Sequence, residues 1–269
     1  MSRQLAALPF ALLALSSLGA CATLGGGGEQ SVADAATGAP QGARPIDRHA
    51  REQVMREDTL TQMAFWAGEY QTFPNDLEAA QRFAEALRKG GCMDRAVQIA
   101  AEALSRFPDD RQLLTTYGYA QMTLGHPQQA LRPLAAIAAA EPENWRARSA
   151  LGAALDQLGR FGEARQAYQE ALALQPNNPG ILTNLGVSHI MAGEPDDAEP
   201  ILRQAAALPG APIEARQNLA IAIALQGRFD EAEQIERADL PPAQAAQNIE
   251  YLRGLLSDPR RWNDMGRGR

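Results

Sequence analysis

The side chains that most often do chemistry are few here: three histidines and two cysteines in 269 residues. His49, His126 and His189 do not form a ligand pair, because the pattern places His126 in a turn and His189 inside a helix. The acid pairs at residues 109–110 and 196–197 fall where helix capping explains them. The sequence has no CxxC pair, phosphate-binding glycine loop or GxSxG elbow. We therefore expect no catalytic site, no metal site and no cofactor.

The cysteine at position 92 directly follows Gly91, in an expected turn. We expect Cys92 to be partly exposed. It is either a tolerated turn residue or a thiol that pairs with a partner in an oxidising compartment. Two cysteines do not indicate a disulfide framework.

The other cysteine, Cys21, follows a segment with the order of a secretory signal. Residues 1–20 contain Arg3, a short apolar stretch and then small residues. The end of this segment, Leu18-Gly19-Ala20-Cys21, resembles a bacterial lipobox, in which the cysteine becomes the lipidated first residue of the mature chain. The alternative is an ordinary secreted protein with a cysteine there by chance.

Lipidation at Cys21 implies attachment to a membrane. Each buried methylene contributes roughly 0.8 kcal/mol, and stable anchoring needs more than one acyl chain, which lipoproteins of this type carry. Ala22 stands where an aspartate would signal retention at the inner membrane, so the resemblance implies the periplasmic face of the outer membrane in a Gram-negative bacterium. Residues 21–45 are rich in glycine and alanine and are expected to form a flexible tether with a reach of roughly 25–30 Å.

The charge of the chain argues against nucleic acid as a partner. The formal net charge is −7 and the sequence pI is about 5.1, whereas phosphate binding needs clustered lysine and arginine. The densest basic run, at residues 260–269, is interpreted as a solvated tail.

Two series of small residues define the elements that must position any site. Glycine recurs every 34 residues, and an alanine follows each of these glycines by five residues. The members are Gly91, Gly125, Gly159, Gly193 and Gly227, and Ala96, Ala130, Ala164, Ala198 and Ala232. A 34-residue period is the signature of a tetratricopeptide helix-turn-helix repeat, whose copies stack. The predicted fold class is all-α: a right-handed tetratricopeptide α-solenoid.

The repeat boundaries follow from these series. Five repeats over residues 77–246 are expected to begin at Leu77, Arg111, Trp145, Pro179 and Ile213. A proline series with the same spacing begins one repeat earlier, at Pro74, which predicts a degenerate leading repeat over residues 46–76 with its second helix near residues 56–72. The apolar pattern of residues 248–257 predicts a capping helix within residues 247–269, followed by a frayed tail.

Two further patterns concern the helices themselves. Position 8 of every repeat is alanine or glycine, which allows two helices to approach closely. The glycine series is expected to end each first helix in a left-handed conformation. Pro133 and Pro200 fall near the start of second helices, and they are tolerable only if those helices begin late; otherwise the helices kink there.

In tetratricopeptide proteins a concave groove is lined mainly by first-helix positions 2, 5, 6, 9, 12 and 13, and this assignment is carried over from the family. It identifies nine candidate groove residues: Tyr119, Met122, Arg146, Asp156, Asn184, Val187, Ile190, Asn218 and Ile221. Asn184 and Asn218 share one position in successive repeats, where their amides can hydrogen-bond the backbone of an extended peptide.

The groove is expected to take an extended or helical amphipathic peptide. The lysine and asparagine of a chaperone-type carboxylate clamp are missing from it. The alternative for Val187, Ile190 and Ile221 is that they are core residues.

The C-terminal third carries a narrower resemblance. Residues 227–235 read GRFDEAEQI, and residues 237–242 read RADLPP. With the lipobox, the tether and the repeats, this segment resembles the TadD lipoproteins of Flp (tight adherence) pilus systems. The resemblance implies a non-catalytic scaffold that helps to assemble the pilus secretion machinery, with a pilotin-like role toward the secretin. The implied partner is the secretin or another pilus-assembly component.

Two other interpretations remain open. The chain could be a tetratricopeptide adaptor lipoprotein that recruits a cell-wall enzyme or another envelope complex. Catalysis by the chain itself would need a cluster of titratable residues that the repeats do not supply.

Overall fold

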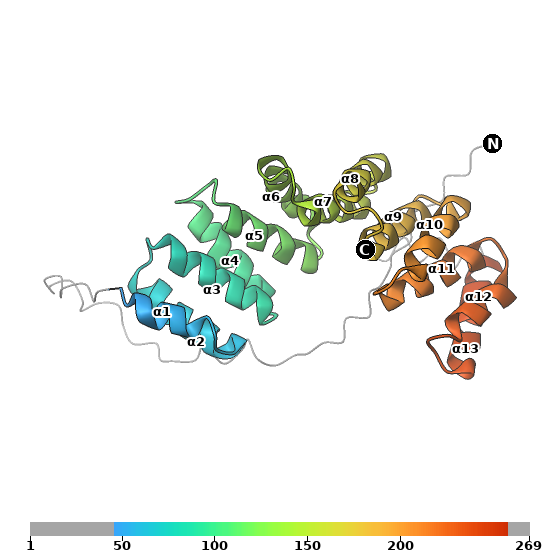
Figure 1. Cartoon of the computed structure of the whole chain (residues 1–269), viewed down its shortest axis with the longest axis horizontal. Coiled ribbons are helices and arrows are strands. Elements are labelled where there is room, and N and C mark those ends of the chain that lie inside the picture. Colours follow the sequence, from blue (N-terminus) through green and yellow to red (C-terminus); the bar gives the residue numbers. More distant parts are fainter. Residues whose placement is uncertain (1–45, 258–269) are drawn as a thin grey trace, which may run out of the picture. The chain divides into compact units, whose positions relative to one another are not determined.

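The computed structural model describes residues 46–257, and the regular elements in that range are all α-helices (Figure 1). These residues fall into two compact units, 46–120 and 121–257, whose boundary lies within α5 (Arg111–Thr123). The signal segment, Cys21, the tether and the tail from residue 258 onward lie outside the described residues, so the expectations about them stay predictions. Within residues 46–257, no helix has both the length and the apolar character that crossing a bilayer requires.

The N-terminal unit contains residues 46–76, which were expected to form a degenerate leading repeat. Its helices are α1 (Arg48–Val54), α2 (Thr59–Thr72), α3 (Leu77–Lys89), α4 (Met93–Leu104) and the first part of α5. Helix α2 packs on α3, and α3 packs on α4, around Trp66, Phe83 and Leu113. Helix α2 begins at residue 59 because the side chain of Asp58 caps it by accepting from the backbone N–H of Thr61.

The C-terminal unit is a series of helical hairpins. After the end of α5 come α6 (Pro127–Ala140), α7 (Trp145–Gln157), α8 (Phe161–Leu174), α9 (Pro179–Met191), α10 (Pro195–Ala207), α11 (Ile213–Leu225), α12 (Phe229–Glu236) and α13 (Pro242–Ser257). From α6 onward each helix packs on the next, and α9, α10 and α11 lie side by side in Figure 1. The first helices of the five repeats begin at the five residues that the 34-residue period indicates.

The glycine series has the backbone conformation expected of it. All five glycines have φ between +73° and +82°, the left-handed region that residues with a Cβ rarely adopt. The amide of the next residue returns to the carbonyl five positions earlier, as from Cys92 N to Leu87 O at 2.9 Å. This is the hydrogen bond of a Schellman motif, which ends each first helix.

Small side chains let the two helices of a hairpin approach. The five alanines of the alanine series are fully buried. A Cβ added to Gly186 would lie 2.5 Å from Leu202 Cγ, and one added to Gly152 would lie 2.7 Å from Tyr168 Cε1. These two glycines are therefore required by close packing, whereas the glycine series is required by the turn.

A series of capping side chains starts four of the first helices, and one member, Asp110, belongs to an acid pair that was expected to cap. In each case the residue before the helix accepts a backbone N–H with its side chain; these residues are Asp76, Asp110, Asn144 and Asn178. They are 34 residues apart, and the series ends at Pro212, which precedes α11 and has no side-chain cap. The structure thus shows a third periodic signal in the sequence.

The structure excludes one of the two alternatives for Pro133 and Pro200 and corrects the start of the capping helix. Helices α6 and α10 do not begin late: each starts with a proline at its first turn, and Pro133 and Pro200 lie inside them. Because proline has no N–H, the helical hydrogen bond from each internal proline to the carbonyl four residues earlier is missing. The capping helix α13 begins at Pro242, inside the segment assigned to the fifth repeat, because a proline is favoured at a first helical position.

Candidate partner-binding face

The first helices α7, α9 and α11 of the C-terminal unit contact one another in sequence and share one surface. We call this surface the first-helix face and define it by its half-buried central residues: Ala150, Ala153, Asn184, Val187, Asn218 and Ile221. None of the six carries a charge. The face therefore offers small apolar side chains and two amides.

The two amides are only partly engaged by the protein. Asn184 Nδ2 donates to Ser149 Oγ of the preceding repeat at 3.3 Å. Within the described residues, Asn184 Oδ1 and both polar atoms of the Asn218 side chain have no protein partner. An extended peptide could use these groups, since each amide can both donate and accept.

The other candidate groove residues have different surroundings. Ile221 packs at the edge of the core that contains Leu219 and Ile223, and Met122 packs against Leu134 and Ala154. Arg146 is exposed, with its guanidinium 4.3 Å from the ring centroid of Trp145. Tyr119 is half-buried and belongs to the N-terminal unit.

Two candidate groove residues face the interior, so their side chains are not offered to a partner. Ile190 is 2% exposed and packs in the core with Leu202 and Leu219. Asp156 is 5% exposed and accepts from Ser188 Oγ at 2.6 Å and Tyr168 Oη at 2.9 Å. Position 12 of these repeats points at the second helix and the next repeat, which the family assignment did not anticipate.

The buried carboxyl of Asp156 joins three helices, because its partners stand on α8 and α9. Burial raises the pKa of Asp156 to about 6, against the opposing effect of the hydrogen bonds from Ser188 and Tyr168. Burial and the nearby Asp156 charge also raise the pKa of the Tyr168 phenol. The phenol therefore stays protonated and acts as a donor.

A cluster at the α9–α10 turn includes a histidine whose surroundings the sequence did not indicate. His189 Nδ1 lies 2.9 Å from Glu194 Oε2, and Arg165 Nη1 lies 2.6 Å from the same oxygen. The ligand atoms of His189, Glu194 and Asp197 lie within 4.8 Å of one another. Because Arg165 already neutralises Glu194, a metal ion would have to compete with it.

The expectation that Cys92 is partly exposed is wrong. Cys92 is 4% exposed and stands at the N-cap of α4. The left-handed turn at Gly91 directs the next residue back toward the helix pair, so its side chain enters the core.

Comparison with known proteins agrees with this architecture. Three tetratricopeptide-repeat models match residues 115–179, 157–209 and 214–235. The fold class is all-α, of the tetratricopeptide-repeat type, and proteins with this scaffold bind other proteins. None of the curated proteins matches the sequence.

Solved structures of MamA are similar to this chain. The structure of MamA MSR-1 has 27% sequence identity and a TM-score of 0.52, and the match covers 59% of this chain and 88% of that one. The structure of MamA AMB-1 has 26% sequence identity and a TM-score of 0.53, and the match covers 59% of this chain and 93% of that one. MamA from Desulfovibrio magneticus RS-1, at 22% identity with a TM-score of 0.55 over 59% of this chain and 89% of that one, shows the fold alone.

Proposed function

We propose that this chain is a non-catalytic outer-membrane lipoprotein that binds a partner polypeptide on its first-helix face. In this role it assists assembly of the Flp/Tad pilus secretion machinery as a pilotin-like partner of the secretin. The observation that carries the binding role is the uncharged first-helix face, with Asn184 and Asn218 one repeat apart.

The uncharged side chains of the first-helix face determine which kind of partner segment can bind there. A charged segment would leave its hydration shell without gaining a counter-ion, which is unfavourable. An extended apolar segment can place its backbone against the amides and its side chains on Val187 and Ile221. The partner segment is therefore extended and mostly apolar.

The place of action is proposed from the sequence. The lipobox ending at Cys21 and the tether over residues 21–45 support an anchored protein that faces the periplasm. The resemblance of residues 216–256 to TadD lipoproteins supports the pilus system. An anchored scaffold would hold its partner close to the membrane into which the secretin assembles.

Replacement of the anchor tests the location and the pilus role together. Cys21→Ser should move the protein out of the outer-membrane fraction and lower the amount of secretin multimer, both measured by fractionation and immunoblotting. Total protein should be matched between strains. Unchanged multimers in a strain whose variant has left the outer membrane would contradict the pilotin-like role.

A photo-crosslinking residue placed at Val187 tests the face. It should capture the secretin, and the same residue at the exposed Gln204 on α10 is the matched control. Asn184→Ala with Asn218→Ala should reduce the yield at Val187 several-fold. Capture of a cell-wall enzyme in place of the secretin would favour the adaptor interpretation.

A further inference from the structure

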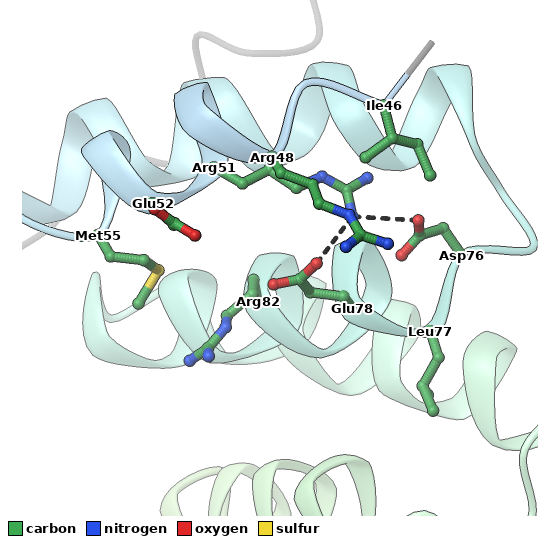
Figure 2. A pocket seen from close by; sticks show the side chains of 9 residues that line it. All are labelled: Ile46, Arg48, Arg51, Glu52, Met55, Asp76, Leu77, Glu78 and Arg82. Carbon is green, nitrogen blue, oxygen red and sulfur yellow. Dashed lines mark hydrogen bonds and ion pairs between the residues drawn. The ribbon is translucent and has the colours of Figure 1, made fainter.

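A cavity opens beside α1 in the N-terminal unit. It is an open cavity with a volume of about 650 Å³, within the range of ligand sites, and its lining comes from α1 and the start of α3 (Figure 2). Arg48, Arg51 and Arg82 line it, together with Met55 and Leu77. The lining thus combines hydrogen-bond donors with apolar surface.

The most buried of these residues is Arg51, which is 4% exposed. Its Nε donates to Glu69 at 2.8 Å, and its Nη1 donates to Asp76 at 3.1 Å and to Glu78 at 2.9 Å. Figure 2 shows this guanidinium directed between Asp76 and Glu78 at the cavity. The carboxylates hold the side chain in one orientation.

One end of the Arg51 guanidinium is not satisfied by the protein. Within the described residues, two buried N–H donors have no acceptor: Nη2 of Arg51 and Nε1 of Trp66. The Arg51 guanidinium lies over two aromatic rings, with its Cζ 5.4 Å from the ring centroid of Trp66 and 6.0 Å from that of Phe73. A buried donor without an acceptor is energetically unfavourable, so an oxygen acceptor that reaches Arg51 Nη2 would bind favourably.

Charge balance decides which acceptor fits. The three arginines of the lining stand with three carboxylates, Glu52, Asp76 and Glu78. A phosphate or another polyanion would meet these carboxylates at close range, which is repulsive. A neutral carbonyl oxygen can accept from a guanidinium without that penalty.

The exposed arginines give access to the buried one. In the described part of the chain, Arg48 has no ion pair, and Arg82 has only a long contact of 3.7 Å with Glu85. Both side chains can therefore move to let a ligand reach Arg51. Glu52 and Glu78 can accept backbone N–H groups, and Met55 and Leu77 offer an apolar wall.

We propose that this cavity is a second peptide site, which binds a short uncharged polypeptide segment through a backbone carbonyl directed at Arg51 Nη2. An apolar side chain of the segment packs on Met55 and Leu77. The mixture of donors, acceptors and apolar surface matches a peptide backbone with one apolar side chain. The site is independent of the first-helix face and of the proposed pilus role.

Nuclear magnetic resonance of the full chain in detergent solution tests the proposal. The probes are acetyl-Ala-Leu-Ala-amide, the same tripeptide with a free carboxylate, and inorganic phosphate. The neutral peptide should shift the Met55 methyl and Arg51 Nε–H signals saturably. Leu77→Ala, which removes part of the apolar wall, should weaken its Kd at least five-fold, whereas Arg56→Ala, an exposed residue outside the lining, should leave the Kd unchanged.

Three outcomes would overturn the proposal. Absence of a saturable shift with millimolar peptide would mean that trapped water alone satisfies the two buried donors. Tighter binding of phosphate or of the free carboxylate would contradict the assignment of a neutral carbonyl. Equal Kd values for Leu77→Ala and the wild type would place binding outside the cavity.

Discussion

Glycine has two separate roles in these repeats. At the turns, as at Gly91, it adopts a positive φ, and an added Cβ would meet nothing within 4 Å. At Gly186, within α9, an added Cβ would lie within 3.1 Å of three atoms of Leu202. Substitution at the first kind of position strains the backbone, whereas at the second kind it separates two helices.

Gly186→Ala should lower the free energy of unfolding by about 1–3 kcal/mol, because Leu202 has to leave its packed position. Gly162→Ala, in α8, is the matched control, since a Cβ there would meet nothing within 4 Å. It should raise the free energy of unfolding by about 0.5–1 kcal/mol through helix propensity. Urea denaturation followed by circular dichroism measures both. Equal effects in the two variants would contradict the close approach of α9 and α10.

Asp156 should make stability depend on pH. Its pKa is raised from 3.8 to about 6, so the fold favours the protonated carboxyl. The stability that it contributes is fully present below pH 3.8 and is lost as the pH rises through about 6. Between these values the wild type should lose on the order of 1–3 kcal/mol relative to Asp156→Asn.

The measurement is the free energy of unfolding of both proteins from pH 3.5 to 7.5, with the exposed Asp109→Asn as control. The difference between wild type and Asp156→Asn should change with pH, and the difference for the control should not. Parallel curves for wild type and Asp156→Asn would show that the carboxyl is not held in a poorly solvated site.

At the scale of the elements, the capping series determines where the first helices start. Side chains one residue before α3, α5, α7 and α9 each satisfy a backbone N–H that the helix leaves unpaired. Helix α11 begins after Pro212 without such a cap. We therefore expect the start of α11 to exchange its amide hydrogens faster than the start of α7 or α9.

Removal of one cap should be measurable. Asn178→Ala should lower the free energy of unfolding by about 1 kcal/mol, because the N–H groups of Gly180 and Ile181 lose their acceptor. Asn178→Asp keeps an acceptor oxygen in the same position and should stay within a few tenths of a kcal/mol of wild type. If chemical denaturation gave both variants the same loss, the effect would not be capping.

At the scale of the whole molecule, the last helix closes the C-terminal core. Ala245, Ile249 and Leu255 of α13 are buried, and Ile249 packs in the same core as Leu219 and Ile223. Terminal elements of a repeat array need a polar outer side for solubility. Helix α13 meets this requirement with exposed residues such as Glu250 and Arg253.

A chain that ends at residue 241 should be less stable and less soluble than the full chain. The loss should be about 3 kcal/mol or more, because Ile249 and Leu255 each contribute roughly 1.5–3 kcal/mol by burial. A chain that ends at residue 257 retains α13 and is the control. Thermal denaturation and size-exclusion chromatography measure the two effects. A 241-residue chain as stable as the control would mean that α13 is not part of the cooperative fold.

The boundaries that could be predicted depend on local interactions. The turn at Gly159 and the start of α7 at Trp145 follow from a glycine conformation and a 34-residue period. The position of Pro133 inside α6 could not be predicted in this way, because packing against neighbouring helices outweighs a single lost hydrogen bond. The start of α13 at Pro242 could have been predicted, since proline is favoured at a first helical position. The capping series could also have been predicted from the sequence, since its four members recur with the 34-residue spacing.

The sequence by itself determined the period, the class of fold and the starts of the first helices, because turn conformation and small-residue spacing act over a few residues. Only the tertiary structure decided which side chains face the core. It placed Asp156 and Ile190 inside, because a rotation of a helix by a fraction of a turn changes which positions face its neighbours. It also brought Arg51 to Glu69 across 18 residues, a long-range contact that no repeat spacing indicates.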